Sequence, residues 1–158
     1  MDRENIYRPT LLVDLSVLDD RSEPTLRELR DRYFTLGVLT KNQREARQRL
    51  AKPGITSYFH KDFIFDKYNK NTREGWLALD RHIRSKSRNL NIKAVVDTSK
   101  EALVQAMNSW VVYTAYHLNR EKKELNASGK NLTVVSSFAD VLRSGVCSEA
   151  QWPINWVE

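Results

Sequence analysis

The chain has 158 residues and a mass of 18.4 kDa, which suits one domain with a single continuous core. Its 41% hydrophobic and 29% charged residues exclude an intrinsically disordered protein, and its net charge of +6 favours an acidic partner. The single cysteine, Cys147, excludes an internal disulfide and a cysteine-based metal cluster. The charged N-terminus and the absence of a long apolar run argue against secretion and against a membrane span.

The first third of the chain predicts one extended segment and two helices. Residues 11–15 are apolar and extended in character. A helix is predicted over 24–36, where Pro24 marks the start and apolar residues recur at three- and four-residue spacing up to Leu36. A second, strongly basic helix over 41–51 is predicted to be capped by Thr40 and ended by the Pro-Gly pair that follows it.

The rest of the chain predicts a short strand and three more helices. Residues 63–65 suit a strand that could pair with residues 11–15 in a small sheet. Helices are predicted over 71–87, over 98–122 with Asp97 or Thr98 as N-cap, and, in a short form, over 136–143. The simplest architecture that accommodates these elements is a single all-α domain over residues 1–158. It is predicted to be an antiparallel four-helix bundle with a small β and aromatic layer at one end.

A basic run closes the predicted third helix. Residues 81–88 contain four Lys or Arg side chains and no acidic residue. Small hydrogen-bonding residues lie among and directly after them. Such a cluster favours a phosphate backbone as partner, because side chains of these types contact phosphates without reading base sequence. The residues concerned are Arg81, Arg84, Ser85, Lys86, Ser87, Arg88 and Asn89. The second helix supplies a further basic stripe that only Glu45 opposes.

A catalytic site is hard to assemble from the sequence. The histidines His60, His82 and His117 are scattered, and no neighbouring carboxylates suggest a metal site for a nuclease that would use His82 as general base. The carboxylates Asp62 and Asp66 are more simply explained by capping or by pairing with adjacent lysines. There is no glycine-rich phosphate loop. The sequence therefore predicts a protein that is not an enzyme, with no metal and no cofactor.

Aromatic side chains crowd residues 58–68. They could stack on the bases of a single strand, or they could form a packing layer. Packing is the favoured interpretation, because Phe63 and Phe65 fall on the same side of the predicted strand.

In its order of features, the chain resembles the coat proteins of rod-shaped plant RNA viruses of the tobacco mosaic virus type. The residues that carry the resemblance are FHKDFIFDKYN at 59–69, the basic positions Arg44, Arg49, Lys86 and Arg88, Val96-Asp97 with Ala102-Leu103, and SSFA at 136–139. Two features depart from the family: the segment between the third and fourth helices is shorter, and the family's paired carboxylates fall on Pro53, Arg73 and Asn91. A carboxylate switch for disassembly therefore does not carry over.

The resemblance implies a structural subunit of a helical viral nucleocapsid, present in the virion and, before assembly, in the host cytoplasm. It implies two partners, single-stranded RNA and further copies of the chain in rods or discs, and no membrane. RNA contacts are expected at Arg44, Lys86 and Arg88, then Arg84 and Arg81, with Ser87 and Asn89 as neutral partners. Subunit contacts are expected at Phe59, Phe63, Phe65, Tyr68, Trp152 and Trp156. The alternative is a small basic nucleic-acid-binding regulatory or architectural protein.

Overall fold

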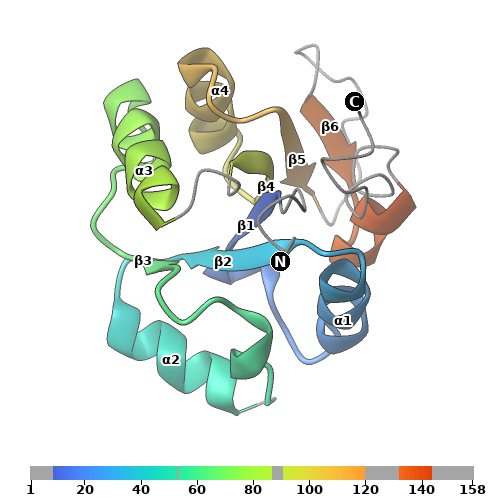
Figure 1. The fold of residues 1–158 in the computed structure, drawn as a ribbon. Helices are drawn as coiled ribbons and strands as arrows, with labels where there is room; N and C mark the ends of the chain where they lie inside the picture. The colour runs from blue at the N-terminus through green and yellow to red at the C-terminus, as the bar shows by residue number, and fades with distance from the viewer. Residues whose placement is uncertain (1–8, 53, 87–90, 120–131, 144–158) are drawn as a thin grey trace, which may run out of the picture.

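A computed structural model describes residues 9–52, 54–86, 91–119 and 132–143, and it is an α/β fold (Figure 1). Six strands form one parallel sheet in the order β3-β2-β1-β4-β5-β6. The strands are β1 (Thr10–Asp14), β2 (Thr35–Leu39), β3 (Ile64–Phe65), β4 (Ile92–Asp97), β5 (Thr114–Leu118) and β6 (Leu132–Val135). The prediction of an all-α four-helix bundle is therefore wrong.

Four helices cover the two faces of this sheet. They are α1 (Glu23–Asp31), α2 (Gln43–Ala51), α3 (Arg73–Lys86) and α4 (Lys100–Ser109), and 3₁₀ turns are found at η2 (Leu15–Val17), η3 (Thr56–Tyr58) and η4 (Phe138–Arg143). In Figure 1, α1 and α2 lie on one side of the sheet and α3 and α4 on the other. No helix of the described residues is long and apolar enough to cross a membrane.

The sequence analysis does not predict the strands β2, β4 and β5, because most of their residues are buried. All but the first residue of β2 and all but one residue of β4 are buried. Strands covered by helices on both sides read as continuous apolar runs without the alternation that marks a half-exposed strand. The predicted strand 11–15 does correspond to β1 and the predicted strand 63–65 to β3, but β2 lies between them in the sheet.

Two residues with left-handed backbone end helices where the sequence suggested continuation. Tyr33, at a φ of 72°, follows α1, so Leu36 of the predicted helix 24–36 lies in β2 instead. Trp110, at a φ of 66°, caps α4, and the segment predicted as a helix over 98–122 holds both α4 and β5. The N-caps also differ from those expected: Asn42 caps α2 and Ser99 caps α4, each through its side-chain oxygen.

The sheet separates two hydrophobic cores. On the α1 and α2 side, Leu11 and Val13 of β1 pack with Leu26, Leu50 and other buried residues. On the α3 and α4 side, Leu12 packs with Phe63, Trp76, Leu79 and Leu103. Adjacent β1 residues thus point into opposite cores, as the pleat requires.

The chain reverses its direction across the sheet between β1 and β4. From β1 the chain adds strands in one direction, β2 and then β3, with α1 and α2 on one face of the sheet. It then crosses to the other side of β1, where β4 pairs with β1, and adds β5 and β6 in the opposite direction. In open parallel sheets, ligands bind at such a switch point, in the crevice outside the carboxyl ends of the strands. The end residues Asp14 of β1 and Asp97 of β4 meet at that place.

Candidate active site

Two aspartates form the centre of the candidate site. Asp14 is the last residue of β1 and Asp97 the last residue of β4, and the two strands are hydrogen-bonded neighbours. The side chain of Asp97 is fully buried and that of Asp14 is 14% exposed. Two carboxylates held so close, with one almost out of reach of water, require a cation between them.

Lys70 supplies that cation. Its Nζ lies 2.7 Å from Oδ1 of Asp14 and 2.8 Å from Oδ2 of Asp97. Burial lowers the pKa of Lys70, but its hydrogen bonds to Asp14 and Asp97 outweigh burial, and the net shift is upward. Burial raises the pKa of Asp97, and the charge of Asp14 raises it further, against the opposing effect of Lys70. Lys70 is therefore a charged donor between two carboxylates.

The loop between β3 and α3 is built to hold Lys70. The indole nitrogen of Trp76 donates to the carbonyl of Lys70 at 2.8 Å, and Trp76 itself is fully buried. Thr72 donates its hydroxyl to the carbonyl of Asn69 at 3.0 Å and accepts the N–H of Gly75 at 3.0 Å. These hydrogen bonds hold the backbone of the loop against the first turn of α3, and they thereby fix the position of the Lys70 backbone.

One hydroxyl and two backbone N–H groups orient the two carboxylates. Ser16 donates both its N–H, at 3.0 Å, and its hydroxyl, at 2.6 Å, to Oδ2 of Asp14. The same hydroxyl lies 2.9 Å from Oγ1 of Thr98, and the N–H of Ser99 donates to Oδ1 of Asp97 at 2.9 Å. Among the described contacts, Oδ2 of Asp14 takes two donors and Oδ1 only Lys70, so Oδ1 keeps a lone pair for another partner.

A pocket of about 440 Å³ opens beside Asp14 and Lys70. Its polar wall includes Thr40 at the end of β2, Lys41, Asn69 and Asn71, and its apolar wall includes aromatic residues. The full lining is Asp14, Leu15, Leu39, Thr40, Lys41, Glu45, Phe65, Asp66, Tyr68, Asn69, Lys70, Asn71, Gly75, Trp76 and Leu79. The size is that of a small-molecule site, and the convergent polar groups make it the best-formed candidate in the described part of the chain.

The strand order is that of dinucleotide-binding folds, but the first connection differs from theirs. The residues between β1 and α1 contain no glycine, and an acidic side chain, Asp14, stands at the end of the strand. A glycine cradle for a pyrophosphate is therefore absent from this connection, and a carboxylate faces the crevice instead.

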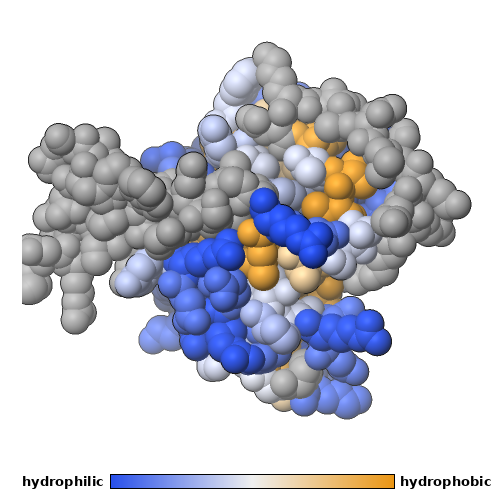
Figure 2. Space-filling view, turned by 90° about the vertical axis from the view of Figure 1, so that its right-hand side faces the viewer, coloured by the Kyte–Doolittle hydropathy of each residue, from blue (hydrophilic) through white to orange (hydrophobic). Residues whose placement is uncertain are grey.

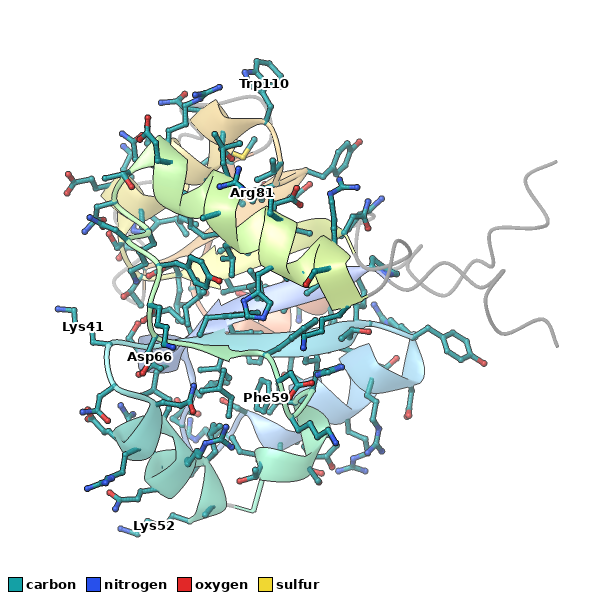
Figure 3. The ribbon with its side chains drawn as sticks, turned by 60° about the vertical axis from the view of Figure 1, so that its left-hand side comes forward. Lys41, Lys52, Phe59, Asp66, Arg81 and Trp110 are labelled. Atoms are coloured by element: carbon teal, nitrogen blue, oxygen red, sulfur yellow. The ribbon has the colours of Figure 1, made fainter. Side chains whose placement is uncertain are left out.

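The basic run predicted to bind RNA is not one free cluster. Arg84 pairs with Asp80 at 2.9 Å, and Nζ of Lys86 lies 3.8 Å from Asp62. Arg81 is exposed on the outer side of α3 (Figure 3), and Arg44 is exposed on α2. Ser87, Arg88 and Asn89 lie outside the described residues.

The aromatic residues expected at subunit contacts are mostly internal. Phe59, Phe63 and Phe65 are 7%, 0% and 4% exposed, so they pack inside this chain and are not available to a neighbouring subunit. Tyr68 is half-buried and donates to or accepts from Nδ1 of His82 at 2.7 Å. Trp152 and Trp156 lie outside the described residues. The preference for a packing layer over base stacking thus agrees with the position of Phe63 and Phe65 in one core.

Sequence reasoning missed Lys70 and assigned the other central residues to local roles. The sequence pattern predicts Asp97 and Thr40 as helix caps and Asp14 as part of a strand. The signal that could have found the site is a repeated pattern: LLVD at residues 11–14 and AVVD at residues 94–97 each place an aspartate directly after a buried apolar run. Carboxyl ends of parallel strands meet at one edge, so two such aspartates are expected to be neighbours.

Comparison with known proteins gives a likeness in fold alone. No protein-family profile and no curated protein sequence matches the chain. A solved structure, the core domain of a candidate phosphoglycolate phosphatase from Streptococcus pneumoniae TIGR4, is similar with a TM-score of 0.59 and 16% identity. The similarity covers 88% of this chain and 96% of that one. The resemblance to rod-shaped virus coat proteins is therefore wrong, and with it the capsid function: the chain has an α/β fold similar to that of this core domain.

Proposed function

We propose that this protein is a phosphomonoester hydrolase that works through a covalent phosphoaspartate on Asp14. The observation that carries the proposal is the position of this carboxylate: it lies at the switch point of the sheet and borders the pocket, with Lys70 at 2.7 Å. Aspartate is an established nucleophile for phosphoryl groups, and a positive charge beside it favours the approach of a phosphate dianion.

The reaction balances in two steps. First, a carboxylate oxygen of Asp14 attacks phosphorus, a bond between that oxygen and phosphorus forms, and the ester P–O bond breaks. The leaving alkoxide takes a proton from water and departs as an alcohol. Water then attacks the phosphoryl group, the aspartyl–phosphate bond breaks, and inorganic phosphate and the free Asp14 carboxylate are restored.

The chain's own residues bind and orient in this scheme. Lys70 offsets the negative charges of Asp14, Asp97 and the incoming phosphate, and Ser16 holds Oδ2 of Asp14 so that Oδ1 faces the substrate. Thr40 borders the same pocket, and its hydroxyl, which donates to the Asn42 carbonyl at 3.2 Å, would rotate to donate to a phosphate oxygen. These groups stand in place before the substrate arrives, so little reorganisation accompanies the charge transfer.

The same carboxylates suit a magnesium ion. One lysine against two carboxylates leaves an excess negative charge, and Mg²⁺ prefers one or two carboxylates plus phosphate oxygens and water. Asp14 and Asp97, at the ends of neighbouring strands, are the residues that would hold the ion. No group of three or more His, Cys, Asp or Glu ligands occurs among the described residues, so water and phosphate oxygens would complete its coordination. When bound, Mg²⁺ supplies charge neutralisation to the transferring phosphoryl group.

The fold comparison supports the proposal without carrying it. The similar solved structure is described as the core of a candidate phosphoglycolate phosphatase. At 16% sequence identity, the likeness shows a shared fold only. The reaction class is argued from Asp14, Lys70 and Asp97, not from that description.

The test is hydrolysis of p-nitrophenyl phosphate with Mg²⁺ present. The purified protein is expected to release phosphate, and Asp14→Asn, which keeps the shape but removes the nucleophile, is expected to lose at least 10²-fold in kcat. Asp20→Asn is the matched control, because Asp20 is exposed on the same connection between β1 and α1. Acid quenching followed by peptide mass spectrometry should find one phosphoryl group on the peptide that contains Asp14. Activity that survives in Asp14→Asn would contradict the proposal.

A further inference from the structure

The helix α2 carries an uncompensated positive surface. Between residues 41 and 52 there are five cationic side chains and one carboxylate, that of Glu45. Arg44 and Arg47 of α2 and Lys41, which directly precedes the helix N-cap, are spaced three apart and are exposed; we name these three residues the basic face of α2. Within the described residues, none of the three forms an ion pair, and the guanidinium of Arg47 bonds only to the side-chain amide oxygen of Gln43, at 3.4 Å.

Several arginines of α1 and α3 pair with nearby carboxylates. On α1, Arg27 pairs with Glu23 at 2.7 Å and Arg32, which follows the helix, pairs with Glu28 at 3.0 Å. Figure 2 views the molecule from the side of α1, whose charged side chains contribute to its hydrophilic lower half. On α3, Arg84 pairs with Asp80. Charge on α1 is thus largely satisfied within the chain. On α3, Arg73 and Arg81 lack an ion pair among the described residues, whereas on the basic face of α2 all three cations lack one and are available to a partner.

The basic face begins at the candidate active site and leads away from it. Lys41 and Glu45 line the active-site pocket, and Arg44 and Arg47 line a shallow hollow beside it together with Gln43, Gln48 and Ala51. In Figure 3, Lys41 and Asp66 lie at the site end of α2, and Lys52 lies at the far end. The helix has nine residues, which corresponds to about 14 Å. A small phosphate ester in the pocket would not extend along that length.

The chemistry of this surface suits a soluble polyanion. The large exposed hydrophobic side chains of the described residues are Tyr33, Val104, Trp110 and Tyr113, and none of them is on α2. A membrane-binding helix would present apolar side chains beside its basic ones. Tyr68 lines the pocket with its ring half-buried against Phe65 and His82, and the part of the ring that remains exposed offers a surface on which a base can stack.

We infer that the substrate is the phosphorylated end of a single-stranded nucleic acid, whose terminal phosphate enters the pocket at Asp14 while its following phosphates contact Lys41, Arg44 and Arg47. This inference rests on the proposed phosphatase activity. Phosphates recur about every 3.4 Å along a stacked strand, so the length of α2 is enough for several contacts. Because such contacts do not read bases, the strand is expected to be bound with little regard to sequence.

The test compares two double variants in fluorescence anisotropy with a phosphorylated single-stranded oligonucleotide. Arg44→Ala/Arg47→Ala removes two charges from the basic face, and Lys61→Ala/Arg81→Ala removes two exposed charges elsewhere. All four side chains are exposed, and Arg44, Arg47 and Arg81 lie in helices, which alanine suits, so both variants should fold. The first variant is expected to bind about tenfold more weakly, and its log Kd should depend on log salt with a slope smaller by about 1.4. The second should bind like the unaltered protein.

Enzyme assays separate this inference from the proposed function. In Arg44→Ala/Arg47→Ala, the rate of removal of the terminal phosphate from the oligonucleotide should fall about tenfold more than the rate of hydrolysis of p-nitrophenyl phosphate. Equal losses in the two double variants, or binding of anionic lipid vesicles or polyphosphate as tight as that of the oligonucleotide, would overturn the inference. If the oligonucleotide binds through the basic face but p-nitrophenyl phosphate is not hydrolysed, the proposed function fails and the binding surface stands.

Discussion

Gly75 should be the most sensitive of the glycines in the described part of the chain, because it lets the loop that carries Lys70 lie against the start of α3. A Cβ added at Gly75 would lie 2.7 Å from the carbonyl carbon of Asn69, and closer still to the carbonyl oxygen. Ordinary carbon–carbon contact needs at least about 3.5 Å, so the backbone of Asn69 would have to move by about 1 Å. The neighbouring residue along the chain is Lys70.

The expected result of Gly75→Ala is a loss in both stability and activity. Overpacking against backbone costs about 1–3 kcal/mol of unfolding free energy, since no flexible side chain can move aside. A displacement of about 1 Å at Lys70 is expected to lower kcat for p-nitrophenyl phosphate by about 10²-fold, because Lys70 would leave its positions at 2.7 and 2.8 Å from Asp14 and Asp97. Urea titration and steady-state kinetics measure the two effects.

Gly54→Ala provides the matched control. Gly54 has a φ of +75° and no atom within 4 Å of an added Cβ, so alanine there meets backbone strain but no steric clash. A cost of about 1 kcal/mol in stability is expected, with kcat unchanged. The reasoning would be refuted if Gly75→Ala kept the stability and kcat of the unaltered protein, or if Gly54→Ala lost as much activity.

Three further changes test the residues around the site. Trp76→Phe removes the donor that holds the Lys70 carbonyl and should cost about 1–3 kcal/mol in urea unfolding; an unaltered midpoint would show that the indole does not anchor the loop. Ser16→Ala should lower kcat about tenfold with little change in stability, because a hydrogen bond to a charged carboxylate contributes about 1.5 kcal/mol; unchanged kinetics would count against its role in orienting Asp14. Burial lowers the pKa of His60 below its ordinary value, because it disfavours the charged imidazolium in the folded state. The contribution of neutral His60 to stability is therefore present above a pH of about 6.5 and is lost as the pH falls through the lower, folded-state pKa. Urea midpoints between pH 5 and 8 should therefore decline at low pH less steeply in His60→Asn, and equal slopes would remove His60 as the cause.

Local pattern predicted several elements but not the fold. The basic helix over 41–51 and the helix over 71–87 lie close to α2 and α3, because their apolar residues recur at helical spacing. The helix over 24–36 failed at its end: Leu36 continues the helical spacing by coincidence, yet it belongs to a buried strand. The strands β4 and β5 failed for a related reason, since short apolar runs do not distinguish a buried strand from a buried helix.

The candidate site could be predicted only in part. The sequence shows that Asp14 directly follows an apolar run, and it shows the same pattern at Asp97. Lys70 carries no such signal, because it lies in a loop 56 residues from Asp14 and reaches it only after Trp76 and Gly75 have placed that loop. Arg44 shows the opposite case, a charged residue whose exposure the helical spacing already indicated.

By itself, the sequence determined the composition of a folded basic protein, the helical character of α2 and α3, and the excess of positive charge on α2. These properties depend on residues a few positions apart, for which helical geometry is enough. The tertiary structure alone decided that β1 and β4 are neighbours, and therefore that Asp14, Lys70 and Asp97 form one charged centre. The physical reason is that strand order in a parallel sheet follows from packing of helices on both faces, a long-range property that local spacing does not encode.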